Sequence, residues 1–413
     1  LLPGGPLAGV VAPDAPFGQA APDLVDRWGA GVLAAAGVLR TFAVLRVPDA
    51  VIGSVEHDLD GEGGYHDALV DLLPESDVPP QLAELAAVRD LELVDPTRWP
   101  AALNLLVTEF GPLLDTPAVA VLPDRGRVPV PAYTRWWLSR HPVLDGRRPV
   151  ELRLPGAVDL DGLYDPVGQT DPRLLAAVGC LTGLADVLAD PELAADLLVR
   201  LGDPDRRVSA VLLREVYARL VTALDGYDPE PPVRVRVAPK VTWPAGDAVV
   251  LDEPYLLPLL AGRAVLPAGG APGPVADLCD VDLASELASE LAPEALTGWV
   301  LSRPARTLAW SAVPGAGLAA ARCGAPVPPA RVCWHEDLRV AARGAGIGGT
   351  PVPWWPDGDT DHVDLAAGPA ALGRALAWRC DRWDRRAAAA EALSAAVGDP
   401  GELDTLTAED SAE

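Results

Sequence analysis

The order of apolar and polar residues along this chain predicts a mixture of helices and short strands. Apolar positions recurring every three or four residues predict helices at 23–36, 66–73, 80–88, 133–140, 172–188, 191–201 and 208–224, a further helix behind Asp95, and a long terminal helix from 368. Runs rich in β-branched residues predict strands at 38–47, 91–94, 118–122, 150–154, 233–237, 248–251, 332–334 and 338–342. We expect 248–251 to pair with 233–237. The fold class predicted is mixed α/β (α+β), with several small helix-rich subdomains.

Proline- and glycine-rich stretches divide this pattern into segments. A chain of 413 residues usually forms more than one domain. We expect a first α/β subdomain over 1–150, in which 1–22 is a connector, and a helix-rich subdomain with a β section over 151–270. A C-terminal α+β subdomain should cover 271–398. The acidic segment 399–413 has few apolar groups to bury and is predicted to be disordered.

One short pattern occurs twice, at 33–39 and 175–181. Both copies read as a helix that ends at a glycine, Gly37 or Gly179, with the next apolar residue folding back on the last turn. Because glycine ends many helices, two ordinary helix ends explain the likeness better than a structural repeat does.

Composition and charge narrow the possible partners. The formal net charge is −26, which opposes binding to nucleic acid and to anionic membranes. The longest apolar run, 28–39, is too short to span a membrane. Five cysteines at scattered positions predict no disulfide framework, so a cytoplasmic, reduced setting is expected. The sequence contains no methionine, and we expect it to be a piece of a longer chain that lacks its N-terminal part.

Large rings and positive charges concentrate in residues 133–149. Two interpretations of this stretch stay open. A binding surface could use the rings and guanidinium groups to hold a partner or a phosphate; its residues would be Arg135, Trp136, Trp137, His141, Arg147 and Arg148. Alternatively, one tryptophan faces the core while Arg135 or Arg140 stacks on it or pairs with acids. The second interpretation is favoured, because adjacent helix positions diverge by about 100° and cannot both face one ligand.

Other motifs lack part of what their chemistry requires. The glycine pattern at 344–349 is followed by Thr350 and Pro351, where no phosphate-binding helix can begin. The acidic run 357–361 resembles half of a calcium loop but lacks its glycine and its bidentate glutamate. Zinc could be held by Cys323, Cys333, His335 and His362, yet no Cys-x-x-Cys pair is present. The sequence therefore predicts no catalytic, cofactor-binding or metal-binding residue, and His57 and His66 are expected to be solvated.

Several segments resemble the C-terminal region of bacterial sacsin-like, heat-shock-protein-90-like (GHKL) ATPases, which are chaperone-type proteins. The segments that carry this resemblance are PLAGVVAPDAPFG at 6–18, WGAGVLAAAGVL at 28–39, AVRDLELVD at 87–95, RWP at 98–100, Trp136-Trp137 followed by HPVLDGRRP at 141–149, and GLYD at 162–165. The resemblance covers mainly residues 1–260. It implies that an ATP-binding domain precedes this chain.

This chain lacks the residues that form the ATP site of that family. That site needs a Glu-x-x-x-Asn element, but the sole asparagine, Asn104, follows Pro100 by four positions. The family's Asp-x-Gly-x-Gly is altered as well, because Glu62 replaces its first glycine after Asp60. The resemblance thus implies a non-catalytic structural and interaction region, with ATP and magnesium bound only upstream. Its expected partners are the N-terminal ATPase domain and possible protein clients. The alternative is an enzyme with a nonstandard site around Arg135, His141, Asp145 and Arg147.

Overall fold

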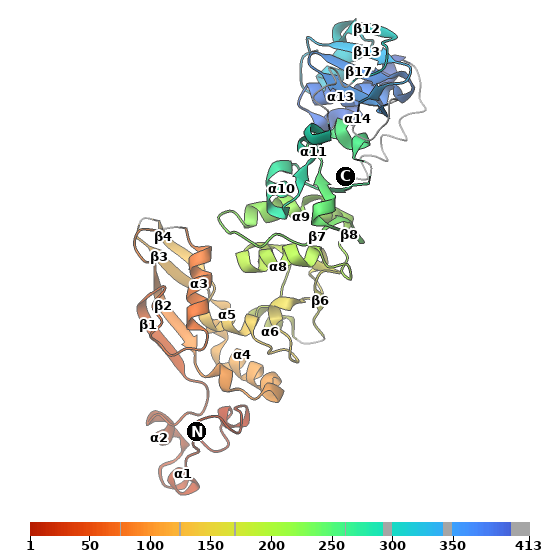
Figure 1. Cartoon of the computed structure of the whole chain (residues 1–413). Helices are drawn as coiled ribbons and strands as arrows, with labels where there is room; N and C mark the ends of the chain where they lie inside the picture. Colours follow the sequence, from red (N-terminus) through yellow and green to blue (C-terminus); the bar gives the residue numbers. More distant parts are fainter. Residues whose placement is uncertain are drawn as a thin grey trace. The chain divides into compact units, whose positions relative to one another are not determined.

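The computed structural model describes residues 1–74, 76–123, 125–168, 171–260, 262–291, 300–341 and 349–397, with the side chains of 288–291 and 397 left out (Figure 1). The predicted acidic tail, and nearly all of the glycine pattern at 344–349, lie outside these ranges. The fold is mixed α/β and multi-domain, as the sequence predicts. By internal contacts the chain divides into two compact units, Leu1–Thr242 and Trp243–Glu413.

The first unit contains an antiparallel sheet of four strands in sequential order. They are β1 (Val44–Val51), β2 (Gln81–Val88), β3 (Ala118–Leu122) and β4 (Gly126–Val130). Helices α3 (Glu62–Leu72) and α5 (Tyr133–Arg140) lie beside this sheet (Figure 1). The hydroxyl of Thr134 accepts a hydrogen bond of 2.9 Å from the backbone N–H of Val88, which fixes α5 to β2.

Further helices and short strands follow in the same unit. Its other α-helices and strands are α1 (Pro22–Trp28), α2 (Ala30–Ala35), α4 (Trp99–Asp115), β5 (Leu152–Arg153), β6 (Asp165–Pro166), α6 (Pro172–Ala177), α7 (Leu184–Leu188), α8 (Pro191–Leu201), α9 (Ala210–Ala223) and β7 (Arg234–Ala238), and β8 (Val241–Pro244) begins at the end of the unit. One hydrophobic core includes residues from Leu7 to Cys180. Residues on both sides of the division expected at 150 therefore build a single core.

The second unit is organised around another four-stranded sheet. Its strands lie in the order β12 (Arg306–Ala309), β13 (Arg331–His335), β17 (Thr360–Asp364) and β16 (Trp354–Asp357), and only β13 and β17 run parallel. Helices α12 (Ala316–Arg322), α13 (Gly368–Arg379) and α14 (Arg386–Val397) share one hydrophobic core with Val332, Trp354 and Val363 of this sheet.

A second apolar cluster in this unit includes Trp355 of β16. Its other members come from loops and from smaller elements. The strands and helices among them are β9 (Ala248–Val250), β10 (Ala264–Leu266), α11 (Ala284–Leu291) and β14 (Arg339–Val340). The same unit also contains α10 (Pro272–Cys279), β11 (Asp282–Leu283) and β15 (Thr350–Pro351). Side chains alternate between the two faces of a strand, so Trp354 and Trp355 enter different clusters.

Several predicted elements are confirmed, namely the strand at 118–122 and the helices at 133–140 and 191–201. The helix predicted at 80–88 is wrong, because this segment is strand β2, paired with β1 along its length. The strand at 248–251 does not pair with 233–237: β9 lies between β10 and β11, whereas β7 pairs with β8. Tertiary pairing overrides local preference in both places.

Glycine breaks two helices that the sequence predicts as continuous. The first is interrupted at Gly29, with a φ of 77°, and the second at Gly179, with a φ of 95°. The two copies of the repeated pattern do end alike: Val38 N–H donates to the Leu33 carbonyl and Cys180 N–H to the Leu175 carbonyl, both at 2.9 Å. Each is the six-to-one bond of a helix ended by glycine.

Candidate functional site

The stretch 133–149 forms helix α5 and the turn that follows it. The helix ends at Arg140, ahead of Pro142, since the residue before a proline disfavours helical geometry. Both tryptophans of the helix are buried: Trp136 is 9% exposed and Trp137 is 2% exposed. The two rings therefore belong to the core of the first unit and not to an interaction surface, which corrects that interpretation for Trp136 and Trp137.

Trp137 is held on several sides. Its indole Nε1 donates a hydrogen bond of 2.8 Å to the carboxylate of Asp60. Its ring stacks on His141, with ring centroids 3.6 Å apart, and lies 6.0 Å from the ring of Trp99. The Nδ1 of His141 lies 2.7 Å from the Trp137 carbonyl oxygen, and its Nε2 lies 3.7 Å from Asp60. His141 thus closes the end of α5, a structural role.

Trp136 faces α3. A Cβ atom added at Gly64 would lie 3.6 Å from its ring, an ordinary van der Waals contact, so this part of α3 packs directly against the ring. On another side, the guanidinium group of Arg140 lies 5.3 Å from the Trp136 ring centre and pairs with Asp190 at 2.7 Å. Arg140 therefore stacks on a tryptophan and also pairs with an acid. The interpretation in which this stretch belongs to the core predicts these contacts for Arg135 or Arg140.

The remaining basic residues of the stretch are also engaged, except for Arg135. Arg147 pairs with Asp165 at 2.7 Å, and Arg148 donates to Glu151 of the next turn. Arg135 has no ion-pair partner among the described residues and lines a cavity of about 420 Å³ together with Trp136, Arg140 and Asp190. Within the described ranges the wall of this cavity does not include His141, Asp145 or Arg147. This cavity therefore does not bring together the four residues of the alternative enzyme site.

Two other histidines of this unit lie inside the fold instead of in solvent. His66 is buried and accepts a hydrogen bond of 3.2 Å from the backbone of Gly53. Its pKa is lowered, mainly because burial disfavours the charged ring. His57 lies 2.6 Å from the buried carboxylate of Glu62. Burial acts to raise the pKa of Glu62, but the hydrogen bonds from His57 and Glu56 outweigh it and the pKa is lowered.

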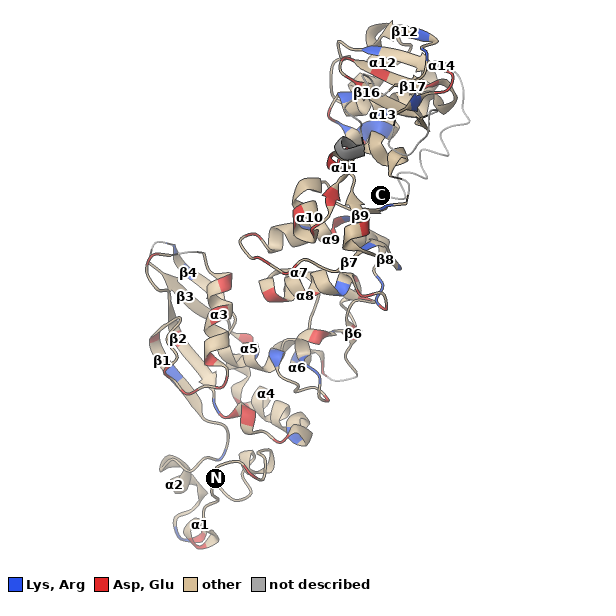
Figure 2. Ribbon diagram, in the orientation of Figure 1, with Lys and Arg blue, Asp and Glu red and all other residues tan. Residues whose placement is uncertain are grey.

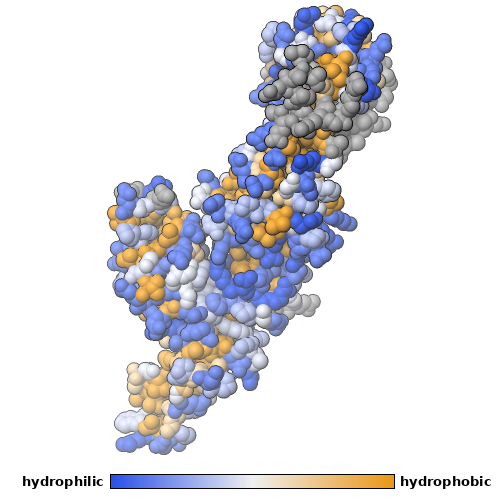
Figure 3. Space-filling view, viewed as in Figure 1, coloured by the Kyte–Doolittle hydropathy of each residue, from blue (hydrophilic) through white to orange (hydrophobic). Residues whose placement is uncertain are grey.

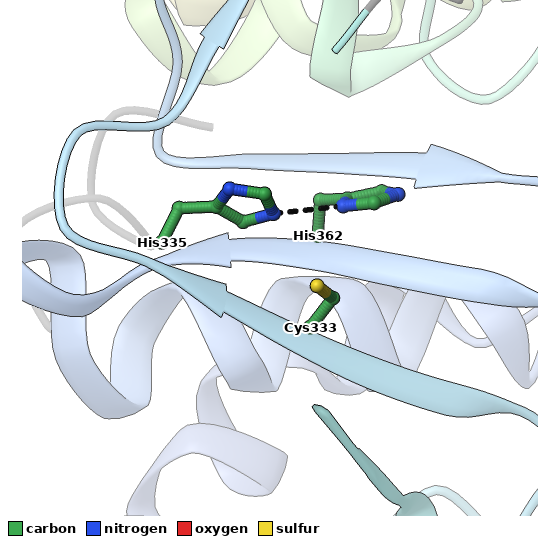
Figure 4. A group of neighbouring side chains, drawn as sticks. All are labelled: Cys333, His335 and His362. Carbon is green, nitrogen blue, oxygen red and sulfur yellow. Dashed lines mark hydrogen bonds between the residues drawn. The ribbon is translucent and has the colours of Figure 1, made fainter. Parts of the chain in front are cut away.

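In the second unit, Cys333, His335 and His362 come together as a group of metal-ligand type. One ligand atom of each lies within 4.8 Å of the other two (Figure 4). Cys333 and His335 are two residues apart on β13, so they share one face of the sheet. His362 is the register partner of Cys333 on the parallel strand β17. The pairing of two strands thus places three donors side by side.

The contacts of this group are few. His335 Nε2 lies 2.9 Å from His362 Nδ1, and the hydroxyl of Thr307 donates a hydrogen bond of 3.3 Å to the sulfur of Cys333. Cys333 and His335 are buried, while His362 is partly exposed and its Nε2 lies 4.0 Å from the carboxylate of Asp357. His335 Nδ1 is buried without a hydrogen bond of normal geometry.

Burial sets the charge of the two rings. It is the main cause that lowers the pKa of His335, and the nearby His362 lowers it further, although the backbone of Arg303 acts the other way. The pKa of His362 is lowered chiefly by burial too. Neutral imidazoles at neutral pH are the form that binds metal ions.

The sequence contains four potential zinc ligands but no Cys-x-x-Cys pair, and the structure brings three of the four together. Cys323 is not among them, because it packs in the helix-covered core around Trp310. The signal in the sequence is the pair Cys333-x-His335 at the predicted strand 332–334, because this spacing puts both side chains on one face of a strand. Nothing local links this pair to His362, since the contact depends on which strands become neighbours.

On the opposite face of the same sheet, the fully buried carboxylate of Asp361 forms an ion pair with an arginine that is partly exposed. Arg379 of α13 approaches its carboxylate to 2.6 Å, and Trp310 Nε1 donates to it at 2.7 Å. The run 357–361 is thus a β-hairpin whose last acid points into the core.

Among the described helices, none combines the length and the apolar character that crossing a bilayer requires. Comparison with protein-family models, with curated proteins and with solved structures gives no match for this chain.

Proposed function

We propose that this chain is a non-catalytic structural and interaction region of a cytoplasmic, sacsin-like, chaperone-type ATPase. Its partners would be the N-terminal ATPase domain of the same protein and possible protein clients, not nucleic acid or membrane. ATP and magnesium would be bound by the upstream domain. This proposal rests on the resemblance of segments within residues 1–165, together with an exposed apolar surface that some of them form.

That surface, formed by α1 and α2, is the observation that carries the proposal. Neither helix contains a buried residue. Leu24, Trp28 and Val32 expose 43%, 52% and 55% of their surface. Hydrophobic colour covers much of this segment on the face shown in Figure 3. Apolar residues grouped on a surface indicate a contact with another protein, because leaving them in water costs free energy.

Charge within the described residues supports the same proposal. Basic and acidic positions are interspersed along the ribbon in Figure 2. Arg140, Arg147 and Arg153 each pair with a carboxylate at 2.6–2.7 Å. Cations already neutralised in this way are poor ligands for a triphosphate, which favours an interaction role over nucleotide chemistry.

A matched pair of substitutions tests the surface. Val32→Asp should weaken binding of this chain to the ATPase domain encoded upstream about tenfold or more, because it puts a charge inside an apolar contact. Val211→Asp, in α9, is the control: Val211 is 70% exposed on a helix and is not part of the proposed surface. Biolayer interferometry would compare the two variants with the parent chain.

The control should bind like the parent chain. Equal weakening by both substitutions would reject the α1–α2 surface. An upstream coding sequence without a Glu-x-x-x-Asn helix followed by Asp-x-Gly-x-Gly would reject the ATPase itself.

A further inference from the structure

We propose that Cys333, His335 and His362 form a zinc site. The inference does not depend on the function proposed above, because it uses only the geometry of the second unit. The thiol of Cys333 and the facing nitrogens of the two histidines are the ligands. One thiolate and two imidazoles suit Zn²⁺, whereas Mg²⁺ and Ca²⁺ prefer oxygen ligands.

The distances fit such an ion with little movement. Two nitrogens bound to one tetrahedral zinc at about 2.0–2.1 Å lie about 3.3 Å apart. In the structure His335 Nε2 and His362 Nδ1 are 2.9 Å apart, and all three ligand atoms lie within 4.8 Å of one another. The imidazoles therefore need to separate by a few tenths of an ångström, and the sulfur needs to move inward. Rotation of the side chains can supply both changes.

The group of Cys333, His335 and His362 places polar atoms next to an apolar cluster. On the neighbouring strand β16 the register partner of His362 is Trp355, which belongs to an apolar cluster. A buried cysteine and two imidazoles lie beside this apolar ring, and Nε2 of His335 and Nδ1 of His362 face each other at 2.9 Å. Buried polar groups normally have partners, so a polar trio in this position needs a reason. A bound cation supplies one.

Groups around the three ligands are placed to support them. The Thr307 hydroxyl donates to the sulfur, which stabilises a thiolate. The carboxylate of Asp357 lies near the outer nitrogen of His362, where a small movement would let it orient the ring. Three protein ligands leave a fourth tetrahedral position for water, and His362 lies on the partly exposed side of the group.

Zinc binding would release one proton from the three ligands. Binding of Zn²⁺ releases the thiol proton of Cys333 to solvent. The two imidazoles share one N–H···N hydrogen bond before binding, so one ring holds its hydrogen on a facing nitrogen. That ring changes tautomer, and both facing nitrogens then donate their lone pairs to the ion. Neither neutral imidazole loses its hydrogen.

Cobalt is the probe of choice, because Co²⁺ replaces zinc and reports thiolate ligation by colour. The full chain, freed of metal with a chelator, should bind one Co²⁺ with a near-ultraviolet sulfur-to-cobalt band, and Zn²⁺ should displace it. Cys333→Ser should abolish the band and lower zinc affinity about 100-fold or more, because it removes a ligand itself and not a group that only hydrogen-bonds to a ligand. His335→Gln and His362→Gln should each lower zinc affinity about as much.

Cys279→Ser is the matched control, since Cys279 is a buried thiol outside the group. It should keep the cobalt band and the zinc affinity. Persistence of the band in Cys333→Ser, or its loss in Cys279→Ser, would refute the site. X-ray absorption of the zinc-loaded parent chain needs no variant: one sulfur neighbour at about 2.3 Å is expected, and a shell without sulfur, or no stoichiometric zinc at all, would refute it as well.

Discussion

Trp137→Ala is expected to lower the free energy of unfolding of the first unit by about 3–5 kcal/mol, the usual cost of removing a buried large ring. Three losses combine: the packing of the ring, its stacking on His141 and its hydrogen bond to Asp60. Urea unfolding followed by far-ultraviolet circular dichroism measures the change without relying on tryptophan fluorescence.

Two further variants make this result interpretable. Trp137→Phe keeps a ring against His141 and loses only the indole donor, so it should cost about 1–2 kcal/mol. Trp28→Ala, on the exposed helix α1, should stay within about 0.5 kcal/mol of the parent chain. If Trp137→Ala cost no more than Trp28→Ala, the stretch 133–149 would not be part of the core.

Arg379→Ala is expected to cost about 3–5 kcal/mol in the second unit, because it leaves the buried carboxylate of Asp361 without its counter-charge. Trp310 alone would then hold that carboxylate. Thermal unfolding by calorimetry would show a lower transition temperature. Arg385→Ala removes an exposed partner of Asp384 and should cost at most about 1 kcal/mol.

A double variant tests the cause. Asp361→Asn removes the buried charge and keeps an oxygen that can accept from Trp310, so adding it to Arg379→Ala should restore part of the lost stability. Further destabilisation by the second substitution would show that the charge of Asp361 is not the source of the cost.

Local chemistry made parts of the fold predictable. Pro142 limits α5, and Asp190 accepts hydrogen bonds from the first turn of α8, so both elements follow from nearby residues. Segment 81–88 is rich in Ala, Leu and Glu, which favour helix, and only its pairing with β1 makes it a strand. Sequence alone does not show that pairing.

In the candidate site, too, some features follow from local sequence and others depend on tertiary contacts. That Trp136 and Trp137 diverge was predictable from helix geometry, but the burial of both was not, because it depends on residues 60–64 and on Trp99. The metal group was missed for a related reason. Cys333 and His362 are neighbours only through the register of two strands that lie far apart in the sequence.

The central claim is that the work of this chain is done by its surfaces, with nucleotide chemistry supplied by another domain. Isothermal titration calorimetry of residues 1–413 with ATP and Mg²⁺ tests it most directly. We expect no heat beyond that of dilution, because the basic side chains of the stretch 133–149 other than Arg135 are already paired. One-site binding of ATP with a micromolar dissociation constant would contradict the account.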